Sequence, residues 1–230
     1  MTIKPMTRSE ALARLANIRS KLSLEEGMCN SSIHKHLTAR DQAAMQFLVK
    51  GGVQDILDAL LIVSHKDHNT KDTPNRVSKM FVQELFAGRY TKPPELRTFP
   101  NVRKFDEQII QGPLDVKSTC AHHFLPFIGR AWVGILPGEL LPGLSKYGRI
   151  VNYYSRRPQI QEELNVQIAD HLQEALKPRG VAVIIKSLHH CMACRGLEQE
   201  SPTITSVMRG EYQASISLKQ EFLSLIQPTL

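Results

Sequence analysis

The chain has 230 residues, enough for one large domain or for one domain with a small accessory segment. Hydrophobic residues make up 42% and charged residues 22%, a composition typical of an ordinary soluble globular protein. The formal net charge of +7 and the pI near 9.3 favour anionic partners. Because the basic residues are scattered along the chain, they suit a small polyanionic substrate at least as well as nucleic acid.

The start of the chain and its cysteines indicate the compartment. Residues 1–10 lack the apolar core of a secretion signal, and no apolar stretch reaches the length of a membrane span. We therefore expect a cytoplasmic protein with no membrane partner. Because the cytosol keeps thiols reduced, the four cysteines favour metal binding or catalysis over disulfides.

The first part of the chain is predicted to be helical. Residues 1–39 are expected to form a variable polar leader, and residues 40–106 a second helical segment. Apolar residues recur at helical spacing between Ser9 and Ile18. A longer helix is expected over about 41–63, with a break or kink at Gly51-Gly52 as one outcome.

A short basic helix is predicted to begin at Pro74, with Asp72 or Thr73 as its N-cap. Arg76 and Lys79 are three residues apart and share one face near the positive end of this helix. That face is either a site for a phosphate-like anion or a solvated basic surface. The pattern alone favours the solvated surface.

Residues 107–230 are expected to form an α+β domain with the order strand, strand, helix, helix, strand, strand. The strands are predicted at about 107–119, 126–136, 181–188 and 203–208, and the helices at about 145–154, 159–176 and, at the C-terminus, 218–226. Ser145 is a candidate cap of the first helix, and Lys146 and Arg149 share a face where a second phosphate-sized anion could bind. Pro158 is expected to open the longer helix.

Two clusters of cysteine and histidine follow predicted strands. Cys120, His122 and His123 follow the first strand, and His189 and Cys191 follow the third. A sheet can bring such strand ends together on a rigid frame. Thiolate and neutral imidazole bind zinc, and three protein ligands leave one position for a water that the metal makes acidic. The pattern predicts one catalytic zinc; the alternative is buried cysteines in a sheet core beside satisfied histidines.

Four ordered motifs resemble those of the GTP cyclohydrolase I family. They are Cys120-x-His122-His123, Gly143-Leu144-Ser145-Lys146-x-x-Arg149-Ile150-Val151, Arg157-Pro158-Gln159-x-Gln161-Glu162 and His189-x-Cys191-Met192-x-x-Arg195-Gly196. The resemblance runs from Asp72 to the end of the chain. It implies a tunnelling fold, in which an antiparallel sheet carries two helices on one face and the sheets of several subunits close into a barrel. It also implies a homodecamer with active sites at subunit interfaces, and zinc-dependent conversion of GTP to formate and 7,8-dihydroneopterin triphosphate.

The same resemblance implies roles for individual residues. The zinc ligands are expected to be Cys120, His123 and Cys191, and the catalytic residues His122, His189 and Ser145. The guanine base is expected to meet Glu162, with Gln161 beside it, and the triphosphate and ribose are expected to meet Lys146, Arg149, Arg195, Arg76 and Lys79.

The sequence departs from the family pattern at Ala121, where the family usually has glutamate. Losing that carboxylate removes a possible orienting group beside the metal. Cys194 and His190 are additional candidate ligands. A fourth protein ligand would close the open position, so Cys194 is interpreted as a small buried residue.

Three functions follow from these patterns. The first is the pterin-forming zinc enzyme acting on GTP. The second, motivated by Ala121, is a zinc hydrolase of the same fold that acts on another purine nucleotide or stops at a ring-opened intermediate. The third is a non-catalytic module that binds nucleotide or nucleic acid and has a closed structural zinc. Gln161 and Glu162 argue against the third, and make nucleic acid an unexpected partner, because such a binder needs no carboxylate that reads a single base.

Overall fold

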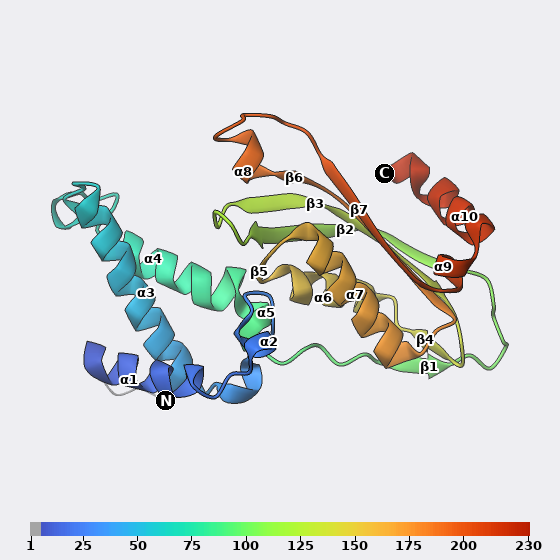
Figure 1. Ribbon diagram of the computed structural model, residues 1–230, viewed down its shortest axis with the longest axis horizontal. Coiled ribbons are helices and arrows are strands. Elements are labelled where there is room, and N and C mark those ends of the chain that lie inside the picture. Colours follow the sequence, from blue (N-terminus) through green and yellow to red (C-terminus); the bar gives the residue numbers. More distant parts are fainter. Residues whose placement is uncertain (1–5) are drawn as a thin grey trace. The chain divides into compact units, whose positions relative to one another are not determined.

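The computed structural model describes residues 6–230, which divide into two compact units, one that ends at Lys92 and one that spans Pro93–Leu230. Figure 1 shows the helices and strands of both units. None of the helices in this described part of the chain is long and apolar enough to cross a membrane.

The N-terminal unit is helical. Its elements are α1 (Arg8–Arg19), α2 (Leu24–Gly27), η1 (His34–His36), α3 (Ala39–Ala59), η2 (Ser64–Lys66), α4 (Thr73–Lys79), the π-helix η3 (Met80–Leu85) and α5 (Ala87–Tyr90). Capping boxes begin three of the helices, through Thr7 in α1, Ser23 in α2 and Thr38 in α3. These reciprocal bonds satisfy backbone donors that a helix start leaves unpaired, which explains where the helices begin.

The long helix α3 continues through Gly51 and Gly52 without a break. A Cβ at Gly51 would lie 3.5 Å from Nη1 of Arg8, so the start of α1 packs closely across α3 at this point. Arg8 also lies 3.8 Å from the carboxylate of Asp55, on the next turn of α3. The helix therefore tolerates both glycines, although each costs about 1 kcal/mol relative to alanine within a helix.

The C-terminal unit contains a five-stranded sheet with the order β5-β2-β3-β6-β7. Its strands are β2 (Ile109–Cys120), β3 (Pro126–Leu136), β5 (Pro158–Gln159), β6 (Gly180–His189) and β7 (Thr203–Gly210). All neighbours are antiparallel except β2 and β5. With helices α6 (Ser145–Ser155) and α7 (Gln161–Leu176) between β3 and β6, the predicted α+β class and element order are confirmed. A second sheet, β1 (Thr98–Pro100) with β4 (Leu140–Pro142), was not predicted.

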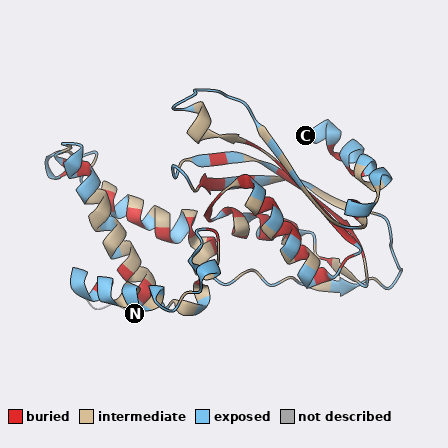
Figure 2. Ribbon diagram, in the orientation of Figure 1, coloured by how far each residue is buried: buried red, intermediate tan, exposed pale blue. Residues whose placement is uncertain are grey.

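Alternation along the central strands divides the core between the two faces of the sheet. Val133 of β3 and Val183 of β6 are buried against α6 and α7, whereas Trp132 and Ile184 face the other way. That second face is covered by α9 (Glu211–Ala214) and α10 (Ile216–Ile226), through which Phe222 packs on Trp132. Figure 2 shows the buried residues running along the sheet and along α6 and α7. The sheet therefore has helices on both faces.

Glycine at position 134 lets α10 approach the sheet. A Cβ there would lie 2.8 Å from Cε2 of Phe222 and 2.9 Å from the hydroxyl of Tyr212, both shorter than a van der Waals contact. Phe222 and Tyr212 are fully buried and their rings are 5.8 Å apart. Close packing of Phe222 and Tyr212 on this face of the sheet therefore requires that position 134 of β3 has no side chain.

Two predicted helix starts are wrong. Ser145 is the first residue of α6 and does not cap it, because Leu144 is already helical and the chain enters through a turn from Lys146 N to Gly143 O. Pro158 belongs to β5, which pairs with the end of β2, and α7 begins only at Gln161. This pairing brings the start of α7 beside Cys120.

Candidate metal centre and active site

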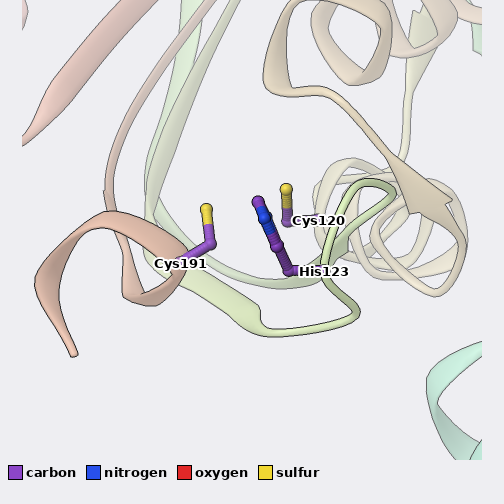
Figure 3. Close-up of side chains that lie close together, drawn as sticks. All are labelled: Cys120, His123 and Cys191. Atoms are coloured by element: carbon purple, nitrogen blue, oxygen red, sulfur yellow. The ribbon is translucent and has the colours of Figure 1, made fainter. Parts of the chain in front are cut away.

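Three metal-binding side chains converge at one end of the sheet. Cys120 is the last residue of β2, His123 lies in the turn before β3, and Cys191 lies in α8 (His190–Ala193), directly after β6. Their ligand atoms all lie within 4.8 Å of one another. In Figure 3 the two sulfur atoms and the imidazole reach into the same space. Since β3 pairs with both β2 and β6, its start adjoins the ends of both strands.

A tight turn brings His123 back to Cys120. The backbone N–H of Phe124 donates to the carbonyl of Cys120 at 2.9 Å, and the N–H of Cys120 donates to the carbonyl of Leu125 at 2.8 Å. Phe124 has φ of 55°, the left-handed backbone that closes the turn. These contacts place the imidazole of His123 on the same side as the Cys120 thiol.

The donor set suits zinc. Burial and the neighbouring Cys120 thiol raise the pKa of the Cys191 thiol, while the Arg195 charge opposes the rise. Two thiols packed this closely resist losing both protons unless a cation sits between them. Two sulfurs and one imidazole are ligands that zinc accepts, and a set of three leaves a fourth position open.

Cys194 lies outside this group, and the prediction that it is buried is wrong. Its side chain is exposed, and its Sγ donates to the carbonyl of His190 at 2.7 Å. The reason is that α8 is a single turn which ends at the surface, so the residue after it is left in solvent. Among the described residues, the close group of metal-binding atoms contains neither Cys194 nor His190.

Two further imidazoles lie near the three ligands along the chain. His122 is exposed, and its Nδ1 lies 3.8 Å from Sγ of Cys120. His189 is half-buried at the end of β6, two residues before Cys191. Burial lowers the pKa of His189, whereas the charge of Glu162 raises it in part. The carboxylate of Glu162 is therefore close enough to interact electrostatically with the imidazole.

Gln161 and Glu162 begin α7 and have different surroundings. Glu162 is exposed, whereas Gln161 is buried, and its Oε1 lies 2.9 Å from Nε2 of His189. The ring of His189 also stacks on Phe127. Phe127 was not predicted as a site residue, because its contact with His189 comes from the pairing of β3 with the distant strand β6.

The predicted anion-binding residues come from three elements. Ser145 and Arg149 are exposed on α6, Lys146 is half-buried there, and Arg195 is exposed beside α8. No hydrogen bond or ion pair among the described residues joins these four side chains to the cysteine–histidine group; Arg195 acts on Cys191 through its charge.

Arg76 and Lys79 belong to the N-terminal unit, where they lie on α4. Nε of Arg76 donates to the carboxylate of Asp72 at 3.1 Å. Asp72 therefore pairs with this arginine, and its side chain does not cap the helix. Arg76 is mostly exposed, so the ion pair is open to exchange for another anion.

The fold and the site together define an α+β protein in which two cysteines and one histidine, a group that could hold a metal ion, converge near the half-buried imidazole of His189. The GTP cyclohydrolase I family model matches residues 49–227, which is most of the chain. The chain therefore belongs to the GTP cyclohydrolase I family, as the four motifs indicate. Its five-stranded sheet and two intervening helices have the strand and helix order that the resemblance implies.

Relatives and one solved structure were also found. GTP cyclohydrolase 1 of Flavobacterium johnsoniae is 43% identical over 181 residues, covering 78% of this chain and 80% of the relative. GTP cyclohydrolase 1 of Salmonella gallinarum is 36% identical over 189 residues, covering 81% and 85%. Among solved structures, the apo form of the archaeosine synthase QueF-Like is 18% identical, with a TM-score of 0.36 over 52% of this chain and 97% of that chain.

Proposed function

We propose that this protein hydrolyses GTP at C8 of the guanine, releases formate and rearranges the remainder to 7,8-dihydroneopterin triphosphate. Membership of the GTP cyclohydrolase I family supports this proposal, as do relatives named GTP cyclohydrolase 1 at 36% and 43% identity. Within the chain itself, the convergence of Cys120, His123 and Cys191 carries the proposal. A centre with three ligands retains the open position that hydrolysis requires.

The metal we propose is zinc, held by Cys120, His123 and Cys191. When bound, zinc lowers the pKa of a water molecule so that it can attack near neutral pH. The thiol of Cys120 is buried and comes from the end of a paired strand, so its position is fixed before a metal binds. Such rigidity favours one coordination geometry.

Two histidines are proposed to move protons. C8 of guanine is a poor electrophile until N7 is protonated, and exposed His122, beside Cys120, is suited to give that proton. Water then adds at C8, the imidazole ring of the base opens and formate leaves. The ribose opens and rearranges before the pterin ring closes, with net use of one water. His189 is the proposed acid and base for these later steps.

Glu162 is proposed to select guanine. A carboxylate accepts hydrogen bonds from N1–H and from the exocyclic amine of guanine, two donors that adenine does not present in this arrangement. Glu162 is exposed at the first turn of α7, and its charge reaches His189. A wrong base leaves this acceptor unpaired, at a cost of about 1–3 kcal/mol.

The triphosphate and ribose are proposed to bind basic and hydroxyl groups from several elements. These are Ser145, Lys146 and Arg149 of α6, Arg195 after α8, and Arg76 and Lys79 of α4. Ser145 is proposed to act at the ribose. Guanidinium and ammonium groups bind phosphate oxygens through charge-assisted hydrogen bonds, which fits the net charge of +7.

We further propose a cytoplasmic homodecamer in which the sheets of several subunits close into a barrel and the active sites lie between subunits. The eight-residue strand β7 supports this assembly because it is the last strand in the described sheet order and offers backbone groups to a neighbouring strand. Sedimentation of the purified protein tests this: a single species near ten times 26.0 kDa is expected, and a monomer at micromolar concentration would contradict it.

Ala121 supports a second candidate, a hydrolase of the same fold with another purine nucleotide as substrate or with a ring-opened product. The residue is half-buried between Cys120 and His122, where a side chain can influence the metal or the substrate. A closed structural zinc has less support, because the exposed thiol of Cys194 bonds to its own helix.

One assay tests the enzymatic proposal. The zinc-loaded protein is incubated with GTP, and formate release and pterin absorbance are followed together. Equal amounts of formate and pterin are expected. Formate without the pterin would favour the ring-opened product, and neither product from GTP but turnover of another purine nucleotide would favour the altered substrate.

A further inference from the structure

The amide of Gln161 is buried and fully engaged by the protein. Only 1% of the residue is exposed. Its Nε2 lies 3.0 Å from the carbonyl oxygen of Ile185, 3.2 Å from that of Thr203 and 2.9 Å from the hydroxyl of Thr205. Its Oε1 contacts the hydroxyl of Ser187 and Nε2 of His189. The amide therefore has no hydrogen-bonding position left for a substrate.

The orientation of this amide follows from its neighbours. Main-chain carbonyl groups only accept hydrogen bonds, so the NH₂ group must face the carbonyls of Ile185 and Thr203. The reversed amide would hold an oxygen against both, in a buried site where unsatisfied acceptors are costly. Oε1 must consequently face Ser187 and His189.

This orientation decides which nitrogen of His189 carries a proton. An amide oxygen only accepts, so Nε2 of His189, at 2.9 Å, must donate. In the neutral imidazole the other nitrogen, Nδ1, then holds the lone pair. Stacking on Phe127, with ring centroids 4.7 Å apart, restrains the plane of the ring at the same time.

We propose that Gln161, held by Thr205 and Ser187, is a positioning residue that fixes the Nε2–H tautomer of His189 and leaves Nδ1 to exchange protons with the substrate. Its catalytic meaning rests on the proposed function, whereas the tautomer itself does not. The role expected from the resemblance, a contact of Gln161 with the base, is replaced by one that acts through His189.

A spectroscopic experiment tests the tautomer without substrate. Zinc-loaded protein labelled with ¹⁵N-histidine is studied by solid-state NMR at about pH 8, above the ordinary imidazole pKa, and His189 is assigned by subtracting the spectrum of His189→Asn. A protonated Nε2 and unprotonated Nδ1 are expected. In Gln161→Met the Nε2 resonance should shift, because its acceptor is lost. A protonated Nδ1 in the neutral ring, or an unmoved Nε2 resonance in Gln161→Met, would overturn the proposal.

A kinetic cycle tests the positioning role. Gln161→Met is expected to lower kcat for GTP by about 10-fold or more, with KM little changed. The loss should not exceed the roughly 10²- to 10⁴-fold that a general acid or base contributes. In a His189→Ala background the same substitution should have no further effect. A raised KM with unchanged kcat would return Gln161 to substrate binding, and equal losses in both backgrounds would reduce it to a structural residue.

Two conservative substitutions at Thr205 test the same network in case Gln161→Met does not fold. Thr205→Val removes the hydroxyl that Gln161 contacts with little change in shape, whereas Thr205→Ser retains it. We expect Thr205→Val to lower kcat and Thr205→Ser to keep the kcat of the parent, with equal zinc content in both variants. Equal kcat in both variants would contradict the network. If the parent does not turn over GTP, the proposed function fails while the tautomer result stands.

Discussion

The imidazole of His189 stacks on the phenyl ring of Phe127, with ring centroids 4.7 Å apart and planes within 10° of parallel. The two residues are register partners across β3 and β6, so backbone pairing brings the rings together. A stacked aromatic pair is worth about 0.5–1.5 kcal/mol beyond the area it buries. Phe127 is fully buried, so its ring is held in place and restrains the position of the half-buried imidazole.

Replacing Phe127 with leucine is expected to lower kcat while zinc content stays the same, because the imidazole of His189 loses the aromatic ring on which it stacks. Phe222→Leu is the matched control, since Phe222 is equally buried but lies on the opposite face of the sheet. Both changes should reduce the free energy of unfolding by about 1 kcal/mol, as measured in urea. Equal kcat in the two variants would show that stacking has no part in turnover.

The metal centre predicts a difference among three cysteines. Cys120→Ala and Cys191→Ala should each lose zinc, because each removes one of the three proposed ligands. Cys194→Ala should keep one zinc per subunit, since its thiol is exposed and bonded to the carbonyl of His190. Metal analysis of the purified variants measures this directly. Zinc lost from Cys194→Ala but kept in Cys191→Ala would overturn the ligand assignment.

The fold of the C-terminal unit could be predicted because its local patterns and its tertiary pairing agree. Val133 and Trp132 alternate along a strand whose two faces are both covered, and the helical spacing of Leu164, Ile168 and Leu172 matches the buried side of α7. The short sheet of β1 and β4 could not be predicted in this way. Three-residue strands have no periodicity of their own and depend on pairing with a distant segment.

The convergence of Cys120, His123 and Cys191 was likewise predictable, because cysteine and histidine followed strand ends. Surroundings set by distant residues were not. Gln161 is adjacent to Glu162, yet one is buried and the other exposed, because the first reaches the carbonyls of Ile185 and Thr203 across the sheet. Cys194 is exposed because α8 ends after one turn. Sequence spacing contains neither fact.

Glu162→Gln should weaken GTP turnover by roughly 10²-fold or more, because an acceptor of two charge-assisted hydrogen bonds becomes a mixed donor and acceptor facing two donors. Glu163→Gln, a change to the neighbouring carboxylate on the same helix, is the control and should have a much smaller effect. If both variants turned over GTP like the parent, Glu162 would be an acidic first-turn residue that only stabilises the helix.

His171 is expected to make stability depend on pH. Burial lowers its pKa, with Glu174 opposing and Arg157 assisting the shift, and its Nδ1 lies 3.0 Å from the hydroxyl of Tyr154. Burial raises the pKa of Tyr154 to about 12, so this hydroxyl remains protonated. The folded protein therefore binds a proton at His171 less readily than the unfolded chain does.

The sign of the effect follows from that difference. Below the ordinary imidazole pKa of about 6.5 the unfolded chain gains the proton first, so stability present above this pH is lost as the pH falls toward the folded pKa. His171→Gln should show a flatter fall in unfolding free energy than the parent as the pH decreases below about 6.5. Equal slopes in the parent and His171→Gln would contradict the prediction.

Ala121 distinguishes a slower enzyme from one with another substrate. Its N–H donates to the carbonyl of Gln159 at 3.1 Å, so its backbone is fixed between Cys120 and His122 and only its side chain is free to vary. If the family carboxylate tunes orientation, Ala121→Glu should raise GTP turnover by about 10- to 100-fold with zinc unchanged. Ala121→Gln, of the same size without charge, should give little of this gain. A parent already as fast as Ala121→Glu would refute tuning, and a parent with no formate release from GTP would favour another purine nucleotide.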